Sequence, residues 1–125
     1  MRHPWVAAGL LLAALPAWAG APGLGEAVMQ NIEAVNESLS SNLGLKAADA
    51  AAADARDLDQ LFAEVEAYFV ARADAPDAVD YTRRSRQAAA GILRAIEASK
   101  FDAANELAVD ISRTCKTCHR KYKAD

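Results

Sequence analysis

Apolar residues recur between positions 51 and 69 of this chain at steps of 4, 3, 4, 3 and 4, and this repeat constrains the fold more than any other feature. The spacing places all of them on one face of an α-helix, as in helices that pack side by side. The residues of this stripe are Ala51, Ala55, Leu58, Phe62, Val65 and Phe69. A helix gains most of its stability when such a face is buried. We therefore predict a helix that ends near Arg72 and packs against other helices.

A second helical repeat precedes this stripe and predicts a helix over residues 24–43. Its apolar residues follow steps of 4, 4, 3 and 4 and are Leu24, Val28, Ile32, Val35 and Leu39. Gly44 comes next, and we expect it to end the helix because glycine adopts the left-handed conformation without a side-chain clash. We expect Asp49 to cap the following helix, since its carboxylate accepts hydrogen bonds from free backbone N–H groups.

A third helix is predicted over residues 77–99. The segment 74–76 indicates a turn, and Pro76 suits the first turn of a helix because its missing N–H is not needed there. The residues expected to be buried on this helix are Ala78, Tyr81, Ser85, Ala88, Ile92 and Ala95. Three arginines lie mostly off that face, and we interpret them as a solvated surface; they are Arg83, Arg84 and Arg86.

A fourth helix is predicted from Asp102, a residue type that caps helix N-termini. The residues expected on its inward face are Ala104, Leu107, Ala108, Ile111, Cys115, Cys118 and Tyr122. Four helices with short connections favour an all-α, antiparallel, up-down-up-down four-helix bundle. A chain of 125 residues corresponds to one domain, and its net charge of −3 gives no reason to expect a nucleic-acid partner.

The first 19 residues have the pattern of a secretory signal peptide. A basic start is followed by a ten-residue apolar run and by Ala17-Trp18-Ala19, which matches a cleavage site. The run is too short to span a membrane, so we expect cleavage after Ala19 and export. The mature domain, 20–125, then has no membrane span, and it keeps one histidine, His119, and one methionine, Met29.

Near its C-terminus the chain contains the motif Cys115-Lys116-Thr117-Cys118-His119. On a helix, at about 100° per residue, Cys118 lies about 60° from Cys115 on one side and His119 about 40° on the other. All three side chains then point toward one flat group beside the helix. C-x-x-C-H is the attachment signature of a c-type haem. We therefore predict one covalently bound haem c, with thioethers to Cys115 and Cys118 and with His119 as the proximal iron ligand.

Other interpretations of the two cysteines are weaker. A thioredoxin-like C-x-x-C needs a setting of alternating strands and helices, which the pattern does not show. A zinc site needs four ligands, and the whole chain has only two cysteines and two histidines. A structural disulfide stays open as an alternative, but it does not explain the adjacent histidine.

With these features the chain resembles the class II c-type cytochromes, the cytochrome c-prime family, over residues 24–123. The resemblance rests on the haem motif in the last helix, its continuation as Cys115-x-x-Cys118-His119-x-x-Tyr122-Lys123, the four helical segments and a methionine in the first helix. The family implies a periplasmic four-helix bundle with one haem, often as a dimer. Its low-spin members fill the sixth iron position with a methionine of the first helix, and its high-spin members leave that position empty.

The resemblance implies that Met29 is the sixth iron ligand. Met29 lies about 60° beyond Ile32 on the first helix, at the edge of the apolar face. A methionine that fills a gap in the core is the alternative, and the sequence also leaves lysine ligation open. The chain departs from the family at Gly25, where many members have an arginine that contacts a haem propionate, so the sequence indicates no propionate partner.

We therefore expect a periplasmic mono-haem cytochrome that carries single electrons between proteins and is not an enzyme. Iron with both axial positions filled has no free site for a substrate, and thioether ligation raises the reduction potential. The alternative is a five-coordinate haem protein that binds a diatomic gas such as nitric oxide.

Five cations surround the motif and favour a redox partner with an acidic docking surface. They are Arg113, Lys116, Arg120, Lys121 and Lys123. The preference for cations at the negative end of a helix dipole accounts for part of this pattern. The apolar outer faces leave monomer and homodimer open.

Overall fold

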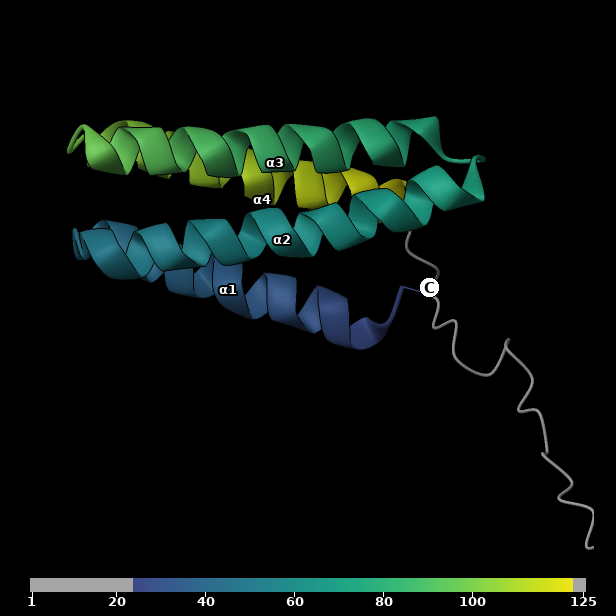
Figure 1. The fold of residues 1–125 in the computed structure, drawn as a ribbon, viewed down its shortest axis with the longest axis horizontal. Helices are drawn as coiled ribbons and strands as arrows, with labels where there is room; N and C mark the ends of the chain where they lie inside the picture. The colour runs from purple at the N-terminus through teal and green to yellow at the C-terminus, as the bar shows by residue number, and fades with distance from the viewer. Residues whose placement is uncertain (1–23, 123–125) are drawn as a thin grey trace, which may run out of the picture.

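The structure, a computed structural model, describes residues 24–122 as four α-helices joined by short turns (Figure 1). The helices are α1 (Glu26–Gly44), α2 (Ala48–Arg72), α3 (Pro76–Glu97) and α4 (Phe101–Tyr122). The predicted all-α four-helix bundle is confirmed, and Pro76 begins α3 as expected. The predicted signal peptide, 1–19, and Lys123 lie outside the described residues.

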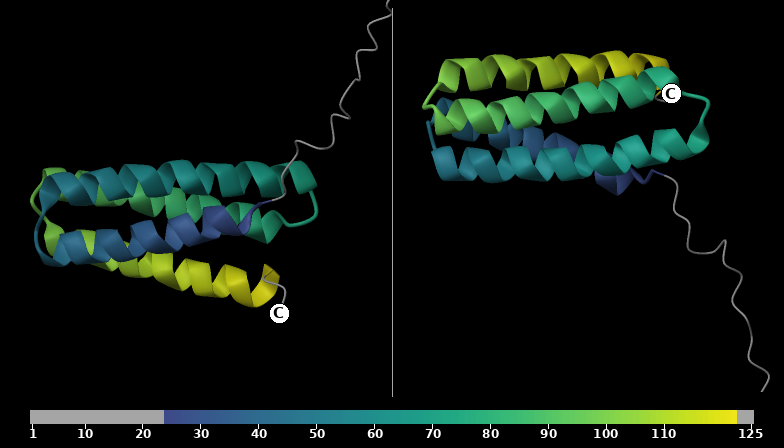
Figure 2. Two further views of the ribbon diagram at one scale, coloured as in Figure 1. Left: turned by 90° about the horizontal axis from the view of Figure 1, so that it is seen from below. Right: turned by 45° about the horizontal axis from the view of Figure 1, so that its top comes forward.

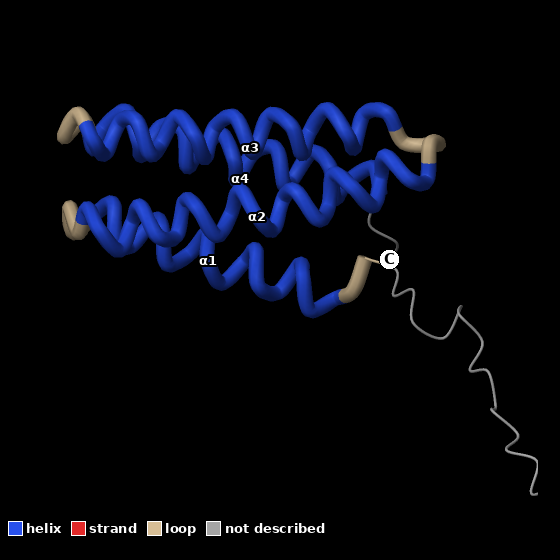
Figure 3. The backbone as a smooth tube through the Cα atoms, viewed as in Figure 1, coloured by secondary structure: helices blue, strands red, loops and turns tan. Residues whose placement is uncertain are grey.

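The helices form a ring in which each packs against two neighbours. Contacts join α1 to α2, α2 to α3, α3 to α4 and α4 back to α1, whereas the diagonal pairs of these four helices do not contact each other through their backbones. Successive helices run in opposite directions (Figures 1 and 3). The start of α1 and the end of α4 therefore share one end of the bundle, which we call the terminal end. Between residues 24 and 122, no helix combines the length and apolar character needed to cross a membrane.

The core confirms the predicted stripe of α2, because every residue of that stripe is buried. The stripe forms one hydrophobic cluster with Leu39 and Leu43 of α1, Ile92 of α3 and Ile111 of α4. Alanines from α2, α3 and α4 are also buried in this cluster. Their small side chains let the helix backbones approach closely, while leucine, isoleucine and phenylalanine fill the remaining space.

On α3 the predicted buried face is only partly right. Tyr81 and Ala88, which we expected in the core, are half-buried, and Thr82 and Ala89 are buried in their place. The buried face is therefore turned by one residue, and Tyr81 and Ala88 lie on its flank. Thr82 tolerates burial because its hydroxyl donates a hydrogen bond to the backbone carbonyl oxygen of Ala78 at 3.1 Å.

The helix ends differ from the predictions at three positions. Gly44 is the last residue of α1 and is not left-handed, while Asp49 and Asp102 lie in the first turns of α2 and α4 instead of capping them. Carboxylates in a first turn still interact favourably with the positive end of the helix dipole. The left-handed residues in the three turns are Lys46 (φ 54°), Ala73 (φ 60°) and Ser99 (φ 57°).

Ion pairs join α2 to α3 on the outside of the bundle. Arg86 Nε lies 2.8 Å from Asp59 Oδ1, and Arg83 Nε lies 3.3 Å from Glu66 Oε1. The three arginines of α3, which we expected to be simply solvated, therefore divide into two groups. Arg83 and Arg86 pair with α2, whereas Arg84 lies on the flank that faces α4.

Leu58→Ala tests the centre of the core. Leu58 is 0% exposed, so the substitution removes buried apolar surface and leaves a cavity, and we expect the free energy of unfolding to fall by about 2–5 kcal/mol. Leu45→Ala is the control, because Leu45 is 75% exposed and its truncation should change stability by about 0.5 kcal/mol or less. Urea unfolding followed by circular dichroism measures both variants. Equal losses would mean that the α2 stripe is not the centre of the core.

Candidate cofactor site

The cysteines and the histidine of the C-x-x-C-H motif lie near the end of α4. Thr114 and Thr117 satisfy their hydroxyls inside this helix, each donating to a backbone carbonyl oxygen one turn earlier. Cys115 and Cys118 are half-buried and pack against the hydrophobic core, whereas His119 is exposed. The thiols thus point toward the bundle, and the imidazole lies at its margin.

Both thiols are free in the structure. Burial raises the pKa of Cys115 above its ordinary value, and the neighbouring Cys118 raises it further. Burial also raises the pKa of Cys118. The two groups therefore stay protonated and uncharged at neutral pH, which disfavours chemistry that depends on a thiolate.

Met29 lies in the first turn of α1, where it is half-buried and packs against the core. It lies on the same flank of α1 as Asn36, because a separation of seven residues is only about 20° short of two full turns. Asn36 faces α4, since its Nδ2 donates a hydrogen bond to Ser112 Oγ at 3.0 Å. Met29 therefore lies on the side of α1 that faces α4.

The hydrogen bond between Asn36 and Ser112 also fixes the register of α1 against α4. The two helices are antiparallel, so seven residues before Asn36 and seven residues after Ser112 lead to the same end of the bundle. These steps reach Met29 on α1 and His119 on α4, each about 10 Å nearer to the terminal end. Met29 and His119 therefore lie at about the same level, each on the flank that faces the other helix.

The helices α1 and α4 separate toward the terminal end, as both views in Figure 2 show. They lie closer together toward the opposite end (Figure 2), and their contact is the sparsest of the four neighbouring pairs. The separation explains the exposure of His119, because the helix that its flank faces has moved away. It also widens the distance between the two helices at the level of Met29.

The end of α4 is held by α2 and α3. The ring of Tyr122 lies against the ring of Phe69 on α2, with centroids 5.7 Å apart. Lys121 forms an ion pair with Asp77 on α3, and the hydrogen bond in that pair raises the pKa of Lys121. The side of α4 that faces α1 is therefore the less constrained side at this end.

These side chains fit a covalently bound haem. The donors are two thiols, one imidazole and one thioether, and they come from two helices that separate at this level. Asn36 lies about two turns after Met29 on α1. Its Oδ1 is a buried acceptor that has no hydrogen-bond partner among the described residues. A Cβ atom at Gly25 would meet only the backbone N of Ala27, at 3.9 Å, so the space beside Gly25 is open.

Two alternative uses of the cysteines find no support among the described residues. Residues 24–122 contain no strand, so the setting of a thioredoxin-like C-x-x-C is absent from them. In this part of the chain, no three side chains of the His, Cys, Asp or Glu type gather to hold a metal ion. Comparisons with protein-family models, curated proteins and solved structures find no match. The function is therefore inferred from the motif and from the geometry of α1 and α4.

The sequence did not reveal the role of two residues that position the site. Asn36 follows Val35 and Ser112 follows Ile111, so both are polar residues at the edge of an apolar stripe. That position is the only signal the sequence holds, and it does not show which helix each residue faces.

Ser112→Ala tests the hydrogen bond that sets the register. Asn36 Nδ2 would lose its acceptor at a part-buried position, and we expect stability to fall by about 1 kcal/mol or more. Adding Asn36→Leu should recover most of this loss, because the unpaired amide is then removed as well. A double-mutant cycle in urea measures the coupling. Strictly additive effects would show that this pair does not fasten α1 to α4.

Proposed function

We propose that this protein is a periplasmic mono-haem c-type cytochrome of the class II kind, which carries single electrons between partner proteins. The C-x-x-C-H motif on the last helix of a four-helix bundle supports this proposal. The observation that carries it is the register of α1 and α4, which brings Met29 to the level of His119.

Each residue of the site has a distinct role in this proposal. Cys115 and Cys118 would hold the cofactor through two covalent thioether bonds. His119 would bind the iron through an imidazole nitrogen, and Met29 would bind it through its sulfur.

The bound haem supplies an iron that takes up and releases one electron. The thioether of Met29 favours the reduced state and thereby raises the reduction potential. With His119 and Met29 both bound, no axial position is open to a substrate. This arrangement suits an electron carrier better than an enzyme.

A second function uses the same residues differently. The separation of α1 from α4 is greatest at the terminal end, where α1 begins (Figure 2). Met29 lies in the first turn of α1, so this separation favours a site in which Met29 does not reach the iron. The protein would then bind a diatomic gas such as nitric oxide on the side opposite His119. Met29 would be a packing residue, in keeping with its contact with the core.

The expected signal peptide supports a periplasmic location, since c-type haem is attached outside the cytoplasm. The cations of α4 support a partner with an acidic docking surface, although they are not all free. Lys121 pairs with Asp77, and Arg113 lies 3.6 Å from Asp110. Lys116 and Arg120 have no salt-bridge partner within residues 24–122.

Replacing the cysteines tests covalent attachment. We expect the intact mass of the wild-type protein to include one haem, and the colour to resist acid-acetone extraction because thioether bonds do not dissociate. Cys115→Ala or Cys118→Ala should weaken maturation, and the double variant should carry no covalent haem. A protein whose mass equals that of the bare chain would contradict the proposal.

Met29→Leu decides between the two functions. Leucine keeps a similar volume and apolarity, so packing should cost less than about 1.5 kcal/mol of stability. If Met29 binds the iron, the wild-type protein is low-spin, and the variant becomes high-spin with a lower reduction potential. Visible spectra and redox titration measure these changes. A wild-type protein that is already high-spin and binds carbon monoxide rapidly would place gas binding first.

A further inference from the structure

Charge is divided unequally between the two halves of the bundle. The helices α1 and α2 contain nine acidic and two basic residues, whereas α3 and α4 contain six acidic and eight basic residues. One helix pair therefore has a net charge of −7 and the other a net charge of +2. This asymmetry orients the protein in the field of a charged partner, although the net charge of the whole chain is only −3.

An open groove runs along the basic half, between α3 and α4, with a volume of about 630 Å³. Its lining is mixed and includes the apolar side chains of Ala88 and Leu107, the arginines Arg84, Arg94 and Arg113, and one carboxylate, Asp110. Arginines beside partly exposed apolar side chains are common in protein interfaces.

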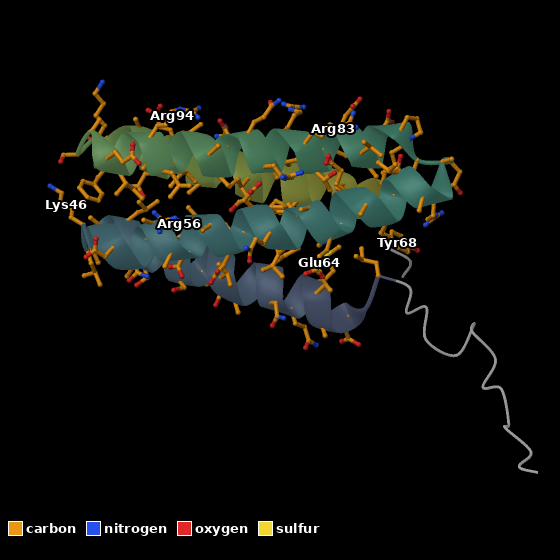
Figure 4. The ribbon with its side chains drawn as sticks, in the orientation of Figure 1. Lys46, Arg56, Glu64, Tyr68, Arg83 and Arg94 are labelled. Carbon is orange, nitrogen blue, oxygen red and sulfur yellow. The ribbon has the colours of Figure 1, made fainter. Side chains whose placement is uncertain are left out.

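Two of the three groove arginines are free to bind a partner. Arg83 and Arg86 pair with α2, but within residues 24–122 neither Arg84 nor Arg94 has a salt-bridge partner. Figure 4 shows Arg94 along α3, on the opposite side of the bundle from α1. The guanidinium of an arginine binds a carboxylate through two parallel hydrogen bonds, so such residues recognise acidic groups well.

Gly91 allows a close contact in the lining of the groove. A Cβ atom at this position would lie 2.9 Å from Leu107 Cδ1 and 3.7 Å from Arg94 Nη2. Because glycine has no side chain, Leu107 packs closely against α3 and the Arg94 guanidinium lies near the backbone of Gly91. The apolar surface and the charge of the groove thus meet at this one turn of α3.

We propose that the groove between α3 and α4 is the docking surface for an acidic protein partner, with Arg84 and Arg94 as its principal contacts. The proposal extends the proposed electron-carrier function, on which it rests, by assigning the partner's contact to α3 as well as to the motif helix. A second copy of this chain is a less suitable occupant, because two identical basic grooves would repel each other across a symmetric interface.

The experiment uses the full mature protein and a hexaglutamate peptide as an acidic probe. At low ionic strength, nuclear magnetic resonance should show shifts confined to α3 and α4. The double variant Arg84→Gln/Arg94→Gln should weaken binding by about five-fold or more. Arg56→Gln is the matched control, since it removes a cation from α2, on the acidic half (Figure 4), and should leave the affinity unchanged. Added salt should weaken wild-type binding, because exposed charges are screened over about 8 Å at physiological ionic strength.

The outcomes separate this surface from the electron-carrier function. The docking surface would be overturned by shifts on α1 and α2, by an absence of binding, or by equal losses of affinity in the control and the double variant. In each case the haem spectrum of the same samples would still test the electron-carrier function separately. A sample without haem would overturn the electron-carrier function. The NMR shifts caused by the peptide would still show whether it binds in the groove. If the double variant changes the sedimentation of the protein alone, a second copy occupies the groove and the proposal of an acidic partner is wrong. Circular dichroism of each variant establishes that the bundle remains folded.

Discussion

The register between α1 and α4 is the constraint on which the proposed site depends. The motif lies at the end of the chain and Met29 near the beginning of the described part, so only the closing contact of the helix ring brings them together. One hydrogen bond, from Asn36 to Ser112, ties the two helices at the point from which both residues are seven positions away. A shift of one helical turn, about 5.4 Å, would remove the match between their levels.

The residues that form the core differ from the residues of the candidate cofactor site. The α2 stripe and the buried residues of α3, such as Ile92, form a core that does not include the half-buried cysteines or Met29. At the terminal end, Tyr122 of α4 contacts Phe69 of α2 and Lys121 pairs with Asp77 of α3. A group bound between α1 and α4 would add contacts between the two neighbouring helices that pack least closely, and would stabilise the fold by binding the native state alone.

Sequence periodicity predicted the fold well where side chains are large, and less well where they are small. The large members of the α2 stripe, Leu58, Phe62, Val65 and Phe69, follow steps of 4, 3 and 4, so the period is clear, and every member of the stripe is buried. On α3, alanines occupy positions 88–90, and hydropathy alone does not show whether Ala88 or Ala89 enters the core. The choice depends on how α3 packs between α2 and α4.

The candidate site was likewise predicted only in part from the sequence. A motif confined to one helical turn is visible in the sequence, because the positions of Cys115, Cys118 and His119 follow from helix geometry alone. The relation between Met29 and His119 is not visible, since it depends on two polar residues on different helices. Of the groove arginines, only Arg113 was expected to face a partner. The positions of Arg84 and Arg94 are not visible in the sequence, because neighbouring arginines of α3 face different helices.

The helix α4 contributes residues to both the candidate cofactor site and the groove. Its flank toward α1 carries His119 and Ser112, and its flank toward α3 lines the groove with Arg113. An α-helix with its side chains is only about 10–12 Å wide. A partner bound in the groove would therefore lie about one helix diameter from a haem held by Cys115 and Cys118. Because one rigid element carries both features, the distance between partner and cofactor would not depend on a flexible loop, and docking would bring the two redox centres into a fixed relation.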